Sequence, residues 1–165
     1  MSISFNADEV FEMGMDVEKN GEAYYRKAAE KVDDPAVKEV MIFLADEEQK
    51  HFQIFRKLRE SLPAKATTTV TQDPEDQEAL YLDALVKSRL FNTEKEAERI
   101  ASSVKGELEA LKTALSFEKD TILFFMYMKD MTRKDLGRDK IDMLIEEEHR
   151  HVVKISEIIK TLTEK

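Results

Sequence analysis

Two short stretches of this sequence each place a glutamate three residues before a histidine. Glu148 and His151 form one pair, and Glu48 and His51 form the other, one hundred positions earlier. Residues three apart share a face of an α-helix, so each pair can present a carboxylate and an imidazole to one bound ion. A lone Glu-x-x-His is common on the solvated helix faces of a Glu-rich chain. Two such pairs at a constant offset indicate an internal repeat.

Two further glutamates keep the same register. Glu18 precedes Glu48 by thirty residues, and Glu118 precedes Glu148 by the same interval. Because carboxylate oxygens and imidazole nitrogens are both metal ligands, the two sets are candidate halves of one metal centre. The predicted metal ligands are Glu18, Glu48, His51, Glu118, Glu148 and His151.

Four long amphipathic segments must position these residues, because apolar side chains recur in each at alternating steps of three and four, as in the helices of a bundle. The segments comprise about residues 7–31, 35–61, 107–131 and 136–162. Asn6 with Glu9 forms a capping-box start, and Asp34 before Pro35 starts the second helix. The pair at residues 20–21, Asn-Gly, usually marks a turn, but the apolar pattern continues through it, so one helix is predicted there.

Short connections make each successive pair of helices an antiparallel hairpin, whereas residues 62–106 form a long crossover. A helix of roughly 25 residues is about 37 Å long, so a crossover between parallel helices needs at least that reach. Residues 75–91 are predicted as a helix within it, and Thr93 with Glu96 caps a further short one. The apolar residues of the crossover exceed one stripe. They either cover the bundle or contact a second copy in a homodimer.

The four predicted glutamate ligands lie where an apolar interior is expected. Each of the four glutamates stands in the middle of an apolar helix face, where a carboxylate costs several kcal/mol unless it is paired or bound to a metal. No Lys or Arg stands on those four faces to neutralise them. Two divalent metals would balance four carboxylates, and two neutral imidazoles would complete their coordination. A hydrogen-bonded core histidine or a register-setting core glutamate explains one hairpin as well, but explains both poorly.

Composition narrows the class of protein. The 165 residues and 19.1 kDa suit one domain spanning residues 1–165, and 42% hydrophobic residues interleaved with 37% charge predict an all-α fold. A net charge of −9 argues against nucleic acid or an anionic membrane as partner. The longest apolar run, residues 122–128, is too short to span a bilayer, and no signal sequence is evident, so a cytoplasmic location is expected. With no cysteine, any metal must be held by oxygen and nitrogen.

Three motifs link the chain to a known family. Glu18 is followed by Lys-Asn-Gly-Glu-Ala-Tyr-Tyr, residues 44–51 read Leu-Ala-Asp-Glu-Glu-Gln-Lys-His, and residues 145–151 read Ile-Glu-Glu-Glu-His-Arg-His. Across all four long helices the chain resembles the rubrerythrin branch of the ferritin-like di-iron carboxylate superfamily. Such bundles take one Glu from each of two helices and Glu-x-x-His from each of the other two. The resemblance implies a ferritin-like antiparallel four-helix bundle with short helices in the crossover between its second and third helices.

The resemblance also implies a cofactor and roles for the ligands. Two iron ions are expected, with manganese or a mixed pair as alternatives. Glu48 and Glu148 would bridge them, while Glu18 and Glu118 would be terminal ligands. His51 and His151 would each bind one metal. Such proteins activate peroxide or dioxygen, which places them in the oxidative-stress response.

Several neighbours of these residues have two interpretations. Tyr25, two turns from Glu18, is a candidate hydrogen-bond donor to a liganding carboxylate, with core packing as the alternative. Glu22 is either a spare ligand or a structural residue, and its counterpart in the repeat is Ile122. A solvated helix face explains the off-face neighbours, namely Asp46, Glu47, Glu146, Glu147 and His149.

Three departures from the family pattern bear on function. Typical rubrerythrins carry a second domain with four cysteines that delivers electrons, and this sequence has none, so an external donor such as a rubredoxin-like protein is expected. The extra carboxylate of the third helix is missing, because only Thr121 of that turn faces inward. Phe125 replaces the tyrosine expected opposite Tyr25.

The leading hypothesis is a di-iron oxidoreductase that reduces peroxide or dioxygen with electrons from a separate donor. The first alternative is ferritin-like iron handling without catalytic turnover. The second alternative is a metal-free helical interaction module, whose melting temperature a chelator would leave unchanged.

Overall fold

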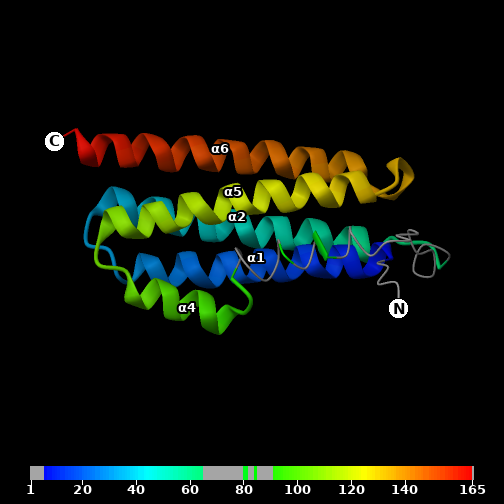
Figure 1. Ribbon diagram of the computed structural model, residues 1–165, viewed down its shortest axis with the longest axis horizontal. Coiled ribbons are helices and arrows are strands. Elements are labelled where there is room, and N and C mark those ends of the chain that lie inside the picture. Colours follow the sequence, from blue (N-terminus) through cyan, green and yellow to red (C-terminus); the bar gives the residue numbers. More distant parts are fainter. Residues whose placement is uncertain (1–5, 65–79, 82–83, 85–90, 165) are drawn as a thin grey trace.

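The computed structural model describes residues 6–64, 80–81, 84 and 91–164. Its long helices are α1 (Ala7–Ala29), α2 (Pro35–Glu60), α5 (Glu107–Met131) and α6 (Arg138–Thr163). A shorter helix, α4 (Glu94–Ser103), precedes α5, and a 3₁₀ turn, η1 (Lys134–Leu136), joins α5 to α6. Within these described ranges every regular element is helical (Figure 1).

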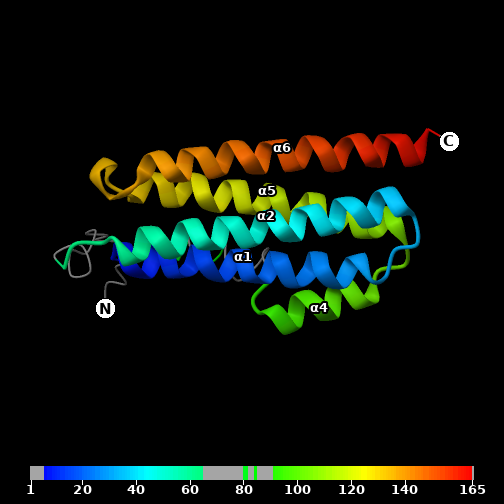
Figure 2. The ribbon, with the colours of Figure 1, turned by 180° about the vertical axis from the view of Figure 1, so that it is seen from behind.

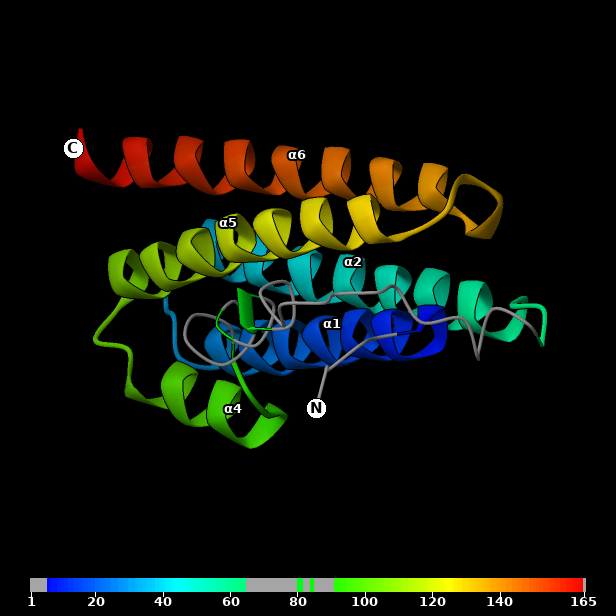
Figure 3. The same ribbon diagram turned by 45° about the vertical axis from the view of Figure 1, so that its right-hand side comes forward.

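The four long helices form an antiparallel bundle built from two hairpins, as predicted. The hairpin α1–α2 packs on the hairpin α5–α6 through the contacts of α1 with α5 and of α2 with α6 (Figures 1 and 2). The C-terminal end of α2 and the N-terminal end of α5 lie at opposite ends of the bundle, as the predicted long crossover requires (Figure 1). Before entering α5, the chain forms α4, which packs against α1 (Figure 3). None of the helices in the described residues has the length and apolar character needed to cross a membrane.

The helix starts follow the capping signals of the sequence. At α1 the Asn6 side chain accepts from the Glu9 N–H, and the Glu9 carboxylate accepts from the Asn6 N–H. At α2 the Asp34 side chain accepts from the N–H groups of Ala36 and Val37, with Pro35 at the first helical position. Thr93 accepts from the Glu96 N–H at the start of α4. These side chains satisfy backbone donors that have no partner within the helix.

The predicted helix ends were less accurate. The first helix stops at residue 29 rather than 31, because the N–H groups of Glu30 and Lys31 bond three residues back in a tight turn. The second ends at residue 60, one residue early. The predicted start of the fourth helix at residue 136 was wrong. Gly137 has φ +96°, a left-handed conformation outside the helical range, so α6 begins at Arg138.

The Asn-Gly pair inside α1 does not break the helix. Asn20 bonds to the crossover, and Gly21 leaves space for a side chain of α2. The Asn20 amide donates a 2.6 Å hydrogen bond to the carbonyl oxygen of Phe91, at the end of the crossover. The Phe91 ring lies between those of Tyr24 and Phe117, with centroids 5.0 and 4.9 Å away. Gly21 lies beneath the carboxylate of Glu48. The pair therefore fixes the crossover to α1 and leaves room for a buried side chain.

Most of the helix predicted for residues 75–91 lies outside the described residues. Leu80, Tyr81 and Ala84 are helical and exposed, and the Tyr81 ring lies 5.2 Å from that of Tyr127 on α5. Phe91, at the end of the predicted span, is buried but not helical. A homodimer contact through this segment stays a prediction.

The internal repeat of the sequence is also a repeat of the core. Every buried residue of α5 follows a buried residue of α1 by one hundred positions, and the same holds for α6 and α2. The repeat is not exact in size: Val17 corresponds to Phe117, and Gly21 to Thr121. The two hairpins are thus related by an approximate two-fold axis.

Candidate metal centre

The structure brings the six predicted ligand residues together inside the bundle. Glu18 comes from α1, Glu48 and His51 from α2, Glu118 from α5, and the last pair, Glu148 and His151, from α6. Five of these side chains have 0% exposure, and His151 has 3%. Each stands one helical turn from apolar core residues of its own helix, so the polar cluster has an apolar surround.

Their ligand atoms fall into two overlapping groups, each with all atoms within 4.8 Å of one another. The first group contains Glu18, Glu48 and His51; the second contains Glu48, Glu118, Glu148 and His151. Glu48 therefore belongs to both groups. The two oxygens of Glu148 also face different histidines, with Oε1 2.8 Å from His51 Nδ1 and Oε2 2.8 Å from His151 Nδ1. This is the placement that bridging carboxylates require.

The two halves of the cluster match in detail. Glu18 Oε2 lies 3.7 Å from His51 Nδ1, and Glu118 Oε1 lies 3.7 Å from His151 Nδ1. The imidazole rings are nearly parallel, with an interplanar angle of 16° and centroids 5.6 Å apart. The approximate two-fold axis therefore passes between two similar sets of donor atoms.

Many of the donor atoms have no hydrogen-bond partner among the described residues. Both oxygens of Glu18 and of Glu48 are in this state, as are Glu118 Oε2, Glu148 Oε1 and His51 Nδ1. Although His51 Nδ1 and Glu148 Oε1 are close, they are not aligned as a hydrogen bond. A buried polar group left without a partner costs roughly 1–3 kcal/mol, and a charged one costs more. Oxygen and nitrogen donors aimed at shared points in this way fit divalent cations.

Gly21 makes the position of Glu48 possible. A Cβ atom at residue 21 would lie 2.8 Å from Glu48 Oε2 and 2.7 Å from the ring of Phe117. Since a Cβ atom does not approach other atoms this closely, the Glu48 carboxylate occupies space that any larger residue would fill. The equivalent position in the second hairpin is Thr121, whose buried hydroxyl oxygen has no hydrogen-bond partner among the described residues.

Without metal, protons must compensate the charges. Burial, reinforced by the neighbouring carboxylates, raises the pKa of Glu18 and of Glu48 far above the usual range, and raises that of Glu118 to about 8. Burial opposes the charged imidazoles, but contacts with carboxylates outweigh it and raise the pKa of His51 to about 9 and of His151 to about 10. Metal binding to these residues must therefore displace protons.

Glu148 is the exception among the four carboxylates. Burial acts to raise its pKa, but the close contacts with His151 and His51 outweigh burial and hold that pKa well below the usual range. A charged Glu148 between two protonated imidazoles is the form expected for the metal-free site. The carboxylate that lies between the two histidines thus carries its negative charge in the metal-free protein.

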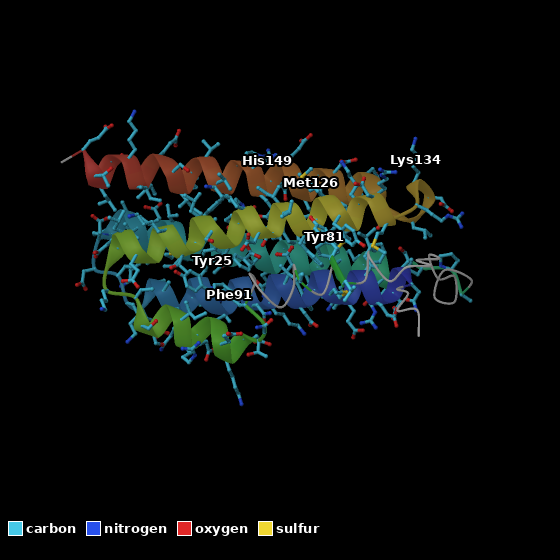
Figure 4. All side chains as sticks on the ribbon, in the orientation of Figure 1. Tyr25, Tyr81, Phe91, Met126, Lys134 and His149 are labelled. Carbon is cyan, nitrogen blue, oxygen red and sulfur yellow. The ribbon has the colours of Figure 1, made fainter. Side chains whose placement is uncertain are left out.

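Tyr25 hydrogen-bonds one of the predicted ligands. Its hydroxyl donates to Glu118 Oε1 at 2.5 Å, across the interface between α1 and α5 (Figure 4). Burial, together with the nearby charge of Glu118, raises the pKa of Tyr25 well above its usual range, so the hydroxyl keeps its proton. At the equivalent position Phe125 packs on Phe55, with ring centroids 5.2 Å apart. The second half of the bundle therefore lacks this donor.

Two residues near the centre were assigned incorrectly from the sequence. Glu147 was interpreted as part of a solvated face, but its side chain is only 29% exposed and its Oε2 lies 2.9 Å from His51 Nε2. Its counterpart Glu47 was interpreted in the same way, but its side chain is only 17% exposed, and one of its carboxylate oxygens lies within 4.8 Å of nitrogens of both His51 and His151. The recurrence of both glutamates at the hundred-residue offset was the signal that could have identified them. In contrast, Glu22 pairs with Arg26 at the surface, and His149 is exposed on α6 (Figure 4).

A surface cavity of about 540 Å³ reaches the edge of the cluster between α2 and α6. Its lining includes His151, the half-buried Glu47 and Glu147, and the ring of Phe43. One ligand residue thus contacts a solvent-filled space, while the other five are fully enclosed.

The bundle, its crossover and its central carboxylate–histidine cluster define a ferritin-like fold. Among solved structures, a Thermotoga maritima protein described as a candidate ferritin-like diiron-carboxylate protein matches with a TM-score of 0.72. Sequence identity is 22%, and the match covers 95% of this chain and 96% of that chain. The rubrerythrin family model matches residues 8–108, more than half of the sequence, and the chain belongs to the rubrerythrin family. No curated protein matches the sequence significantly.

Proposed function

We propose that this protein binds two iron ions through its six buried glutamate and histidine residues and reduces peroxide or dioxygen with electrons from a separate donor. The observation that carries the proposal is the convergence of unpartnered, fully buried carboxylate oxygens on two points, flanked by two imidazole nitrogens. Manganese, alone or with iron, satisfies the same donor set.

Two ferrous ions at this position would supply two electrons, which with two protons convert one hydrogen peroxide to two waters. The chain itself provides the enclosure and the orientation. Apolar residues of all four helices exclude bulk water, and the Gly21 backbone leaves room for Glu48. Tyr25 holds a proton on its hydroxyl against Glu118, which fixes the direction of that carboxylate.

The electrons need an outside source. The 165 residues contain no cysteine, so they hold no thiolate-bound electron carrier of their own. We propose a small redox protein of the rubredoxin class as the donor. A cytoplasmic location and peroxide as the physiological oxidant belong to the same proposal.

A second candidate function is iron handling without catalytic turnover. It is favoured by Thr121, which stands where the family resemblance implies a further carboxylate on the third helix. A centre with fewer carboxylates suits a protein that oxidises and passes on iron. In that case Fe(II) would be oxidised once, and an added electron donor would not sustain further consumption of oxidant.

Metal analysis after anaerobic loading with Fe(II) tests the first step. Wild-type protein should retain about two ions per chain, and the double variant Glu48→Ala, Glu148→Ala should retain none, since both bridging positions are lost. Glu146→Ala, at an exposed position next in sequence to the cluster, is the matched control and should bind normally. Full metal content in the double variant would reject the assignment.

Turnover assays then separate the two functions. Peroxide consumption should continue in proportion to a supplied reductant if the protein is a reductase. One burst of oxidation, unaffected by the reductant, would favour iron handling. A melting temperature that does not respond to a chelator, combined with no metal uptake, would instead support a metal-free interaction module.

A further inference from the structure

The two nitrogens of the His51 ring face different environments. Nδ1 points into the cluster, 2.8 Å from Glu148 Oε1. Nε2 points outward and lies 2.9 Å from Oε2 of Glu147, a residue of the opposing helix α6. Glu147 belongs to none of the three groups of candidate ligand atoms in the described residues, and its side chain is 29% exposed at the rim of the surface cavity. It therefore contacts the centre only through His51.

We propose that Glu147 is a positioning residue that accepts a hydrogen bond from the Nε2–H of His51 and thereby directs the Nδ1 lone pair at one metal. This inference rests on the proposed metal binding. A neutral imidazole has one N–H donor and one acceptor nitrogen, and only the acceptor can bind a metal. A carboxylate on Nε2 selects the tautomer with a free Nδ1, fixes the ring plane and makes Nδ1 a stronger donor.

The second half of the bundle lacks the equivalent bond. Glu47 has a carboxylate oxygen within 4.8 Å of both imidazoles, yet in the described part of the chain it hydrogen-bonds Lys50 on its own helix and not His151. His151 is held instead by the ring of Phe43, which packs edge-on at 6.0 Å between centroids. The residue equivalent to Phe43 is Met143. One histidine is thus oriented by a carboxylate and the other by an aromatic ring.

This difference predicts two metal positions of unequal dependence on Glu147. Removing Glu147 should weaken the ion bound by His51 and leave the ion bound by His151 in place. Glu146 precedes Glu147 on α6, is exposed, and lies outside every group of candidate ligand atoms in the described residues. Glu146→Ala is therefore a matched control for Glu147→Ala.

Zinc titration of the full chain tests the proposal, because Zn²⁺ binds this donor set and is redox-silent. Wild-type protein should take up two ions. Glu147→Ala should weaken one of them by about 10- to 100-fold, the usual effect of losing the partner of a ligating histidine. Glu147→Gln should recover part of this loss, since its amide oxygen still accepts from Nε2–H. Glu146→Ala should bind both ions as the wild type does.

Nitrogen-15 NMR of the zinc-loaded protein gives a readout that a general loss of stability would not produce. The chain has three histidines, so each ring can be assigned. The Nε2–H of His51 should exchange slowly with solvent in the wild type and in Glu146→Ala, and rapidly in Glu147→Ala. Equal behaviour of the two alanine variants, in affinity or in exchange, would overturn the inference while leaving two-ion binding intact. A wild type that takes up no zinc would overturn metal binding, and the inference with it.

Discussion

Replacing Gly21 by alanine should change the stability of the metal-free protein and its affinity for metal to different extents. In a helix interior this change normally stabilises by about 1 kcal/mol, because alanine has the higher helix propensity. Here the new methyl would lie 2.7 Å from the Phe117 ring and 2.8 Å from Glu48 Oε2. Overpacking of this kind costs about 1–3 kcal/mol. The metal-free variant should therefore lose between about zero and 2 kcal/mol relative to the wild type.

The effect on metal binding should be larger than the effect on folding, because Glu48 belongs to both groups of ligand atoms. If its displacement weakens binding tenfold, an ion present at 100 times the wild-type Kd stabilises the variant by about 1.4 kcal/mol instead of about 2.7. Thermal unfolding with excess Mn²⁺ and with chelator measures this difference for each protein.

Gly14→Ala is the control for Gly21→Ala. It has the same propensity gain, and its added methyl would crowd Phe55 and Met128 at 3.0–3.1 Å without touching a ligand residue. Its metal-dependent gain in melting temperature should equal that of the wild type. If Gly21→Ala also keeps the full gain, then the approach of Glu48 to α1 is not needed for binding, and the geometric reasoning fails.

Two further predictions concern protons and hydrogen bonds. The raised pKa of Glu118, about 8 against 4.5, and of His51, about 9 against 6.5, mean that the folded metal-free protein binds protons more tightly than the unfolded chain, so its stability falls as pH rises through this range. Metal replaces those protons, so the melting-temperature gap between metal-loaded and chelated protein should widen from pH 6 to pH 8.5; a constant gap would contradict proton displacement. Above pH 8, where Glu118 is ionised, Tyr25→Phe should destabilise the protein by about 1.5–3 kcal/mol in urea unfolding, because the bond to Glu118 is then buried and charge-assisted. Tyr24→Phe, which removes a bond to a backbone carbonyl, should cost about 1 kcal/mol, and equal losses would argue against an ionised Glu118.

The hundred-residue repeat explains why the architecture could be predicted from the sequence. Apolar spacing identified the four long helices, and the N-caps at Asn6 and Asp34 set two of their starts. Because Glu18, Glu48 and the equivalent residues of the second hairpin keep one register, their convergence followed from the geometry of a bundle. Their role as metal ligands stays a prediction.

Contacts between hairpins could not be predicted in the same way. The bond from Glu147 to His51 depends on how closely α6 approaches α2, and helix periodicity places Glu147 away from the apolar face. The bond from Asn20 to Phe91 likewise joins residues 71 apart through the crossover. The start of α6 was missed because glycine is compatible with both helical and left-handed backbone. Only the turn between α5 and α6 selects the left-handed form for Gly137.

The burial of the ligand residues has a kinetic consequence. With five of the six side chains fully enclosed, an ion can reach or leave the centre only when the helices separate for a moment. Each hairpin packs more extensively within itself than against the other, so the interface between the hairpins is where such opening should occur. The time for which an ion stays bound would then depend on how often this interface opens, and not on the affinity of the site alone. Substitutions along that interface would change how fast the protein loads without altering a single donor atom.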